Sequence, residues 1–91
     1  MPVEKSRAVI EKSDMVPEME EDAVYVASSA MDKHSVDMHI ASFIKHEFDR
    51  KYKTTWNCIV GKNFGSFIHH EKGGFVSFRL NGYNILLFKL G

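Results

Sequence analysis

The stretch Trp56–His70, WNCIVGKNFGSFIHH, decides the fold expected for this chain. β-branched and aromatic residues dominate it, and the glycine-flanked run at 61–65, GKNFG, interrupts it. This pattern predicts two short strands that meet at a turn, and it contains no apolar stripe at helical spacing. The second strand, Phe64–His69, carries little charge, although soluble proteins normally protect the edge of a sheet with charge. We therefore expect this strand to be a working edge, to which partners add a strand of their own.

The residues that follow this stretch predict a β-hairpin. Phe75–Leu80 alternates cleanly between two sets of side chains, as a strand does. Asn81-Gly82 predicts a type I′ turn, because both central positions of that turn need positive φ. The last strand, Tyr83–Leu90, is apolar on both faces, which is expected of a strand covered on both sides.

The residues that precede it predict one strand and two helices. Ser6–Glu11 is too short for a helix and favours an edge strand. A first helix is expected after a cap at Ser13 or Asp14, with Pro17 in its first turn and an end near Lys33 and His34. A second helix is expected after a cap at Ser35 or Asp37, and it ends in a basic turn at Arg50-Lys51. Apolar residues at helical spacing form one stripe on each helix: Met15, Met19, Ala23, Val26, Ala27 and Ala30 on the first, and Val36, Ile40, Phe43, Ile44 and Phe48 on the second.

These elements predict an α+β fold, in which an antiparallel β-sheet is packed by two α-helices. The order expected along the chain is one strand, two helices, and then four strands in antiparallel succession. Residues 1–91 are expected to form a single domain, with residues 1–5 flexible.

Composition excludes several classes of function. The chain has 12 basic and 12 acidic residues and a formal charge of zero, so nothing draws in a nucleic acid. No apolar run approaches membrane-spanning length, and membrane insertion is not expected. The single cysteine, Cys58, and an N-terminus without a signal-peptide core indicate the reducing cytoplasm.

The five histidines do not form a recognisable chemical motif. His69 and His70 are neighbours in a predicted strand and point to opposite faces, while His34, His39 and His46 are scattered over the predicted helices. No nucleophile, base and orienting group can be named, so we expect no enzyme activity, no cofactor and no metal site. One alternative stays open, a small metal- or thiol-dependent regulatory protein that uses Cys58 and His70.

Several motifs resemble the small cytoplasmic dynein light chains of the hub type, the light chain eight family. They are Asp14-Met15, residues 44–52 (IKHEFDRKY), Trp56–Ser66, and residues 85–89 (ILLFK) with Gly91. The likeness runs from about Arg7 to the end of the chain. It implies a strand-swapped homodimer, in which Phe64–His69 crosses to the sheet of the partner subunit.

The resemblance also implies a function. Short linear motifs of disordered proteins would add as antiparallel strands in a groove beside the crossing strand, and dynein intermediate chain would be one such partner. The setting implied is the cytoplasm and the cytoskeleton, in a microtubule-associated motor complex. The groove residues implied are Asp37, Met38, Lys62, Asn63, Phe64, Gly65, Ser66, Phe67, Ile68, His69, His70, Phe75, Ser77 and Arg79. The dimer-interface residues implied are Asn57, Ile59, Gly61, Phe64, Ser66 and Phe67.

Four positions depart from the family pattern. Asn57 stands where the family usually has a histidine that can charge at mildly acidic pH, so we expect a dimer that resists dissociation between about pH 5 and 7. Met38 replaces a common lysine, and Ser77 and Arg79 replace common tyrosines. These changes lie on the expected groove wall and favour motifs that are more acidic or less dependent on glutamine.

Overall fold

A computed structural model describes residues 8–90. The expectation that residues 1–5 are flexible lies outside the described residues. The elements in chain order are β1 (Val9–Ser13), α1 (Pro17–Lys33), α2 (Asp37–Tyr52), β2 (Trp56–Gly61), β3 (Phe75–Leu80) and β4 (Tyr83–Lys89).

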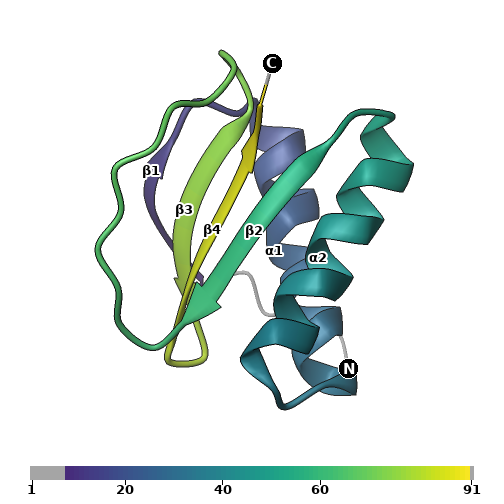
Figure 1. Ribbon diagram of the computed structural model, residues 1–91, viewed down its shortest axis with the longest axis vertical. Coiled ribbons are helices and arrows are strands. Elements are labelled where there is room, and N and C mark those ends of the chain that lie inside the picture. Colours follow the sequence, from purple (N-terminus) through teal and green to yellow (C-terminus); the bar gives the residue numbers. More distant parts are fainter. Residues whose placement is uncertain (1–7, 91) are drawn as a thin grey trace.

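The four strands form one antiparallel sheet in the order β1-β3-β4-β2. Both helices lie on one face of this sheet, as Figure 1 shows. The predicted α+β architecture, two helices on an antiparallel sheet, is therefore confirmed. The edge strands are β1 and β2, while β3 and β4 are central.

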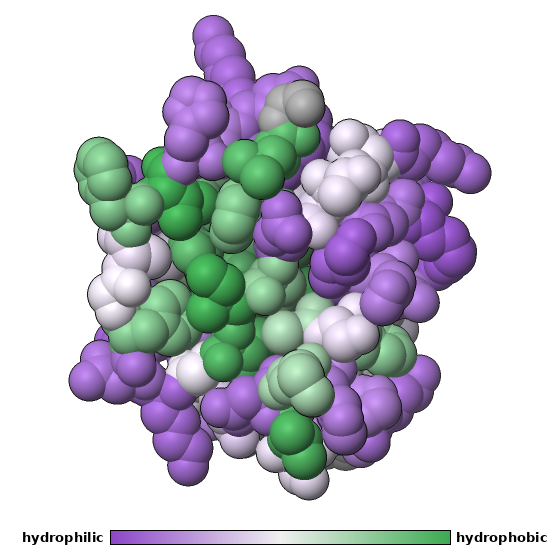
Figure 2. All heavy atoms as spheres, in the orientation of Figure 1, coloured by the Kyte–Doolittle hydropathy of each residue, from purple (hydrophilic) through white to green (hydrophobic). Residues whose placement is uncertain are grey.

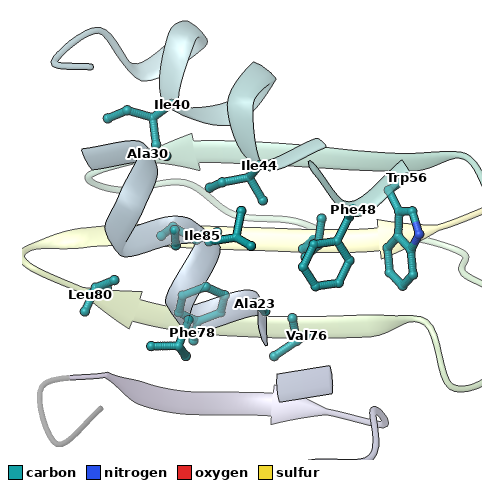
Figure 3. Packing of buried hydrophobic residues seen from close by; sticks show 14 of the residues in the cluster. Ala23, Ala30, Ile40, Ile44, Phe48, Trp56, Val76, Phe78, Leu80 and Ile85 are labelled. Carbon is teal, nitrogen blue, oxygen red and sulfur yellow. The ribbon is translucent and has the colours of Figure 1, made fainter. Parts of the chain in front are cut away.

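The core fills the layer between the helices and the sheet (Figure 3). Ala23, Ala27 and Ala30 of α1 are fully buried, and these small side chains let the helix approach its neighbours closely. The stripe of α2 is buried at Ile40, Ile44 and Phe48, while Val36 is exposed. From the sheet, the buried side chains are Trp56, Val76, Phe78, Leu80, Ile85 and Leu87.

The predicted helix caps are wrong. Val16 and Val36 are the N-cap residues, and neither helix has a side-chain cap hydrogen bond. The Ser13 hydroxyl accepts a hydrogen bond from the Met15 N–H at 3.0 Å. The Asp14 carboxylate accepts one from the distant Gly73 N–H at 2.9 Å. These polar side chains therefore fix the chain that enters α1 and a loop that passes beside it.

The hairpin between β3 and β4 matches its prediction. Asn81 and Gly82 have φ of 53° and 82°, as a type I′ turn requires. Ile85, Leu86 and Leu87 are buried in succession, so β4 is covered on both faces. The predicted first strand is confirmed as an edge strand, although it spans Val9–Ser13.

The prediction of two strands within Trp56–His70 is half wrong. Trp56–Gly61 forms β2, but residues 62–74 contain no strand, so three strands follow the helices instead of four. β2 pairs only with β4, and Gly61 lies opposite Asn84. The next strand, β3, lies two places away from β2 in the sheet. The connection must therefore pass across the sheet, and a hairpin at residues 61–65 cannot form.

Candidate functional site

The connection at residues 62–74, which we call the crossing segment, is attached to the sheet at both ends. At its start the Phe64 ring packs over Gly61, where an added Cβ would lie 3.3 Å from Cδ2 of the ring. At its end the Glu71 N–H donates to the Lys89 carbonyl at 2.8 Å, and the Lys89 N–H donates to the Gly74 carbonyl at 2.8 Å. Between these attachments the segment bows away from the strands (Figure 1).

The crossing segment and the outer face of the sheet, the face turned away from the helices, enclose a hollow of about 200 Å³. Side chains of β3 alternate, so Phe75 and Ser77 point to this face while Val76 and Phe78 enter the core. Leu86 of β4 lies opposite Ser77 in the sheet and is 1% exposed. The lining residues are Lys12, Ser66, Phe67, Ile68, His70, Phe75, Ser77 and Leu86.

The backbone of residues 63–70 makes no hydrogen bond to any residue in the part of the chain that the structure describes. Phe67, in the middle of this run, is fully exposed. An extended backbone with unpaired N–H and C=O groups is a template for pairing with another strand. The crossing segment therefore has the chemical properties of an edge strand although it belongs to no sheet.

His70 holds the end of this run against the sheet. Its ring stacks on Phe75 with 4.6 Å between centroids and 18° between planes. Its Nδ1 lies 3.8 Å from a carboxylate oxygen of Asp14, the same group that accepts the Gly73 N–H. The entry to α1 and the end of the crossing segment are thus fixed to each other.

Six of the groove residues predicted from the sequence surround the hollow, namely Ser66, Phe67, Ile68, His70, Phe75 and Ser77. Asn63, Phe64, Gly65 and His69 lie on the same segment. Lys62 and Arg79 line a second hollow of about 210 Å³ beside the Asn81-Gly82 turn, and Arg79 Nε lies 3.3 Å from the Glu11 carboxylate. Asp37 and Met38, at the start of α2, line neither hollow, so the structure does not bring them to the crossing segment.

Two lining residues were not predicted. Lys12 lies just beyond the strand expected at Ser6–Glu11. Leu86 was treated as part of a continuous apolar run, although simple alternation with Ile85 and Leu87 places it on the outer face. That alternation was the signal in the sequence that could have found it.

The predicted dimer-interface residues on β2 share the outer face. Asn57, Ile59 and Gly61 lie opposite Phe88, Leu86 and Asn84 of β4. Ile59 is exposed. Figure 2 shows hydrophobic side chains gathered in a band that runs down the view, somewhat left of its middle. A partly apolar outer face, next to an edge strand that has only one neighbour, is a surface that another polypeptide can cover.

The alternative based on Cys58 and His70 is not supported by their positions. Cys58 lies opposite Leu87 and packs against the core on the helix side, where burial raises the pKa of its thiol. His70 stacks on Phe75, on the other face of the sheet. Within residues 8–90 no three His, Cys, Asp or Glu side chains converge as metal ligands. No helix in the same range is long and apolar enough to cross a bilayer.

A two-helix, four-strand α+β domain with an open edge and an unpaired extended segment defines a small protein-interaction module. Comparison with known proteins agrees with this class. The family model described as dynein light chain type 1 matches residues 7–90. The chain belongs to the dynein light chain family, as its motifs indicated.

A curated relative, a dynein light chain of Schistosoma mansoni, is 51% identical over 85 residues, which cover 93% of this chain and 96% of the relative. Two solved structures share the fold. The dynein light chain-like domain of the Fasciola hepatica calcium binding protein FhCaBP2 superposes with a TM-score of 0.81 at 16% identity, covering 100% of this chain and 99% of that one. The corresponding domain of CsTAL3 gives 0.75 at 10% identity, covering 91% and 92%.

Proposed function

We propose that this dynein light chain is a non-catalytic homodimeric hub, which binds short linear motifs of disordered partners by β-strand addition. The observation that carries the proposal is the unpaired backbone of residues 63–70. A strand-forming sequence without a partner strand in its own chain is explained most simply by a partner in another chain.

The first partner is a second copy of the chain. β2 is an edge strand bonded only to β4, so its outer edge can accept the crossing segment of another subunit. Two such pairings related by a two-fold axis would satisfy both open edges at once. They would also cover Ile59 and Phe67, which are exposed in the single chain. Asn57, Ile59, Gly61, Phe64, Ser66 and Phe67 form this proposed interface.

The second partner is a short peptide. A strand has two edges, so a crossing segment paired on one side with β2 of the other subunit still offers main-chain groups on its free side. A disordered motif that adds there gains affinity from main-chain hydrogen bonds and selectivity from alternate side chains. The proposed groove consists of residues 62–70, Phe75, Ser77 and Arg79, completed by Asp37 and Met38 once the subunits are paired.

The proposed dimer has two grooves and is therefore bivalent. One short added strand binds at about micromolar strength, whereas two grooves that engage a paired partner raise avidity by roughly 10² to 10⁴. The dimer would thus hold two disordered chains side by side. We propose dynein intermediate chain as one such partner, in the cytoplasmic, microtubule-associated motor complex, and other disordered motif proteins as further ones.

The test compares Ser66→Lys with a matched control, Ser42→Lys. Both serines are exposed, and only Ser66 lies on the crossing segment. Light scattering coupled to size exclusion measures the dimer, and calorimetry with peptides from captured partners measures the groove. We expect Ser66→Lys, and independently Phe64→Ala, to lose the capture of partner proteins and the binding of their peptides. Ser42→Lys should keep both. Capture of the same partners by all three variants would contradict the groove, and a monomeric wild-type chain at micromolar concentration would contradict the hub.

A further inference from the structure

The joint between the two helices brings together two histidines that the sequence pattern left apart. His34 is the C-cap residue of α1, where its N–H donates to the Ala30 carbonyl at 2.9 Å. His39 lies in the first turn of α2, which begins at Asp37. The two rings meet edge to face, with 6.0 Å between their centroids and 70° between their planes. The reversal of the chain at this joint creates the pair, so helical spacing alone could not reveal it.

We propose that His34 and His39 bind a divalent transition-metal ion of the Cu²⁺, Ni²⁺ or Zn²⁺ class. A metal–nitrogen bond is about 2.0–2.1 Å long, so two imidazoles on one ion have centroids roughly 5–6 Å apart. At 6.0 Å between centroids the two rings are close enough to share one ion once ring rotations turn a nitrogen of each toward it. Imidazole nitrogen suits all three of these ions.

Both imidazoles are available for such a ligand. Among residues 8–90, neither ring forms a hydrogen bond or an ion pair. They line a hollow of about 300 Å³ together with Ser42, Phe43, His46 and Glu47. An ion there would have room for water molecules in the positions that the protein does not fill.

The other polar groups of this hollow are less suited to the ion. His46 Nδ1 lies 2.9 Å from the Ser42 carbonyl, and seven residues of helix, about 10.5 Å, separate His46 from His39. Glu47 accepts a hydrogen bond from Arg50 at 2.6 Å. The Lys33 ammonium lies 4.9 Å from the centre of the Phe43 ring and opposes a cation nearby. The site is therefore a two-ligand site of moderate affinity, in keeping with the absence of a converging set of three ligands in the described chain.

Such an ion would link the end of α1 to the start of α2. Asp37 and Met38 directly precede His39, so the ion would also hold these two residues in place. A ligand that binds only the folded chain raises the free energy of unfolding of that chain. The metal proposal is tested separately from the peptide groove, because neither His34 nor His39 is one of the proposed groove residues.

The test uses the full chain without an affinity tag, after dialysis against a chelator. Isothermal titration with Cu²⁺, Ni²⁺ and Zn²⁺ is compared for wild type, His34→Gln and His39→Gln. His46→Gln, in the same hollow, and His69→Gln, on the crossing segment, are the matched controls. Circular dichroism checks that each variant is folded.

We expect one ion per chain, with Cu²⁺ bound most tightly of the three. His34→Gln and His39→Gln should each weaken binding by about tenfold or more, and the control variants should stay close to wild type. Cu²⁺ should raise the midpoint of thermal unfolding in wild type and in the two control variants, but not in His34→Gln or His39→Gln. The proposal is overturned if wild type shows no saturable binding, if His34→Gln or His39→Gln binds as wild type does, or if His46→Gln loses binding equally.

Discussion

Lys53 has a strained backbone conformation at the end of α2, and this strain allows β2 to begin. It closes α2 with φ 57° and ψ 35°, in the left-handed region, where a Cβ atom costs roughly 1–2 kcal/mol. Its N–H donates to the Asp49 carbonyl at 2.9 Å, and the Asp49 carboxylate accepts the Trp56 N–H at 2.7 Å. The strained residue thus turns the chain so that β2 can begin with a fully buried tryptophan.

Replacing Lys53 with glycine should stabilise the fold. Glycine removes the left-handed strain but loses more entropy on folding, so the net gain is about 0.5–1 kcal/mol in the free energy of unfolding. Urea unfolding at fixed protein concentration measures it. Ala41→Gly, in the interior of the same helix, is the control and should cost about 1 kcal/mol. A loss of stability in Lys53→Gly would show that the lysine side chain itself matters.

Asp22 of α1 and Tyr52 of α2 connect the two helices through a partly buried hydrogen bond. Tyr52 donates to the Asp22 carboxylate, and Lys51 Nζ lies 3.0 Å from the same oxygen. Partial burial raises the pKa of Asp22, but the Tyr52 hydrogen bond and the Lys51 charge outweigh it and bring that pKa below its ordinary value of 3.8. Burial, together with the same contact, raises the pKa of Tyr52 to about 12.

This pair predicts a loss of stability in acid. Because the pKa of Asp22 is lower in the folded chain, its contribution is complete above the unfolded value of about 4 and disappears as the pH falls through the folded value. Urea midpoints of wild type and Asp22→Asn should therefore differ at pH 7 and converge near pH 2. Equal differences at both values of pH would contradict the assignment.

The crossing segment is the element in which local sequence and final structure disagree most. Phe64, Phe67 and Ile68 favour a strand, and yet residues 63–70 make no backbone hydrogen bond to a strand of the described chain. Periodicity predicted both helices, the β3–β4 hairpin and the buried β4, because each of these depends on neighbours close in the sequence. It could not predict that β2 pairs with β4, since that pairing joins residues about 30 positions apart.

Hydrogen exchange should identify the pairing of this element. In the single chain, the amides of residues 63–69 have no acceptor and should exchange at nearly the rate of an unfolded peptide. In the proposed dimer they pair with β2 of the second subunit and should become protected as protein concentration rises. The amides of α1 should show strong protection at all concentrations. Fast exchange of residues 63–69 at high concentration would exclude the strand exchange.

At the scale of the whole molecule, the proposed binding sites lie on two surfaces outside the core, at the crossing segment and at the joint between the helices. The core lies between the helices and the sheet, and its residues were largely predictable from amphipathic stripes. The candidate site was predictable where it follows the crossing segment, from residue 66 to His70, and where it follows the alternation of β3. The His34–His39 pair was not predictable, because it depends on the joint between the helices. Asp37 and Met38 were predicted as groove residues from the family resemblance, but they line neither hollow of the single chain.

Asn57 makes a whole-molecule prediction about the proposed dimer. It lies on the outer face of β2, opposite Phe88, and it cannot gain charge in mild acid. The wild-type chain should remain dimeric in sedimentation from pH 7 to about pH 5, whereas Asn57→His should release monomer over this interval. Asn57→Gln, which cannot charge either, is the control. Monomer appearing in wild type over the same interval would refute the role of Asn57.

The two attachments of the crossing segment make it a tether of fixed length. Nine residues, 62–70, lie between Gly61, which is held opposite Asn84, and Glu71, which is bonded to Lys89. Fully extended they reach about 30 Å, close to the 32 Å length of the molecule. A deletion of two residues would shorten this reach by about 7 Å, more than the roughly 4.8 Å between neighbouring strands. In the proposed dimer, the length of this loop would therefore limit which subunits can pair. Subunits would form mixed dimers with relatives whose loop has the same length, and they would not do so with relatives whose loop is shorter.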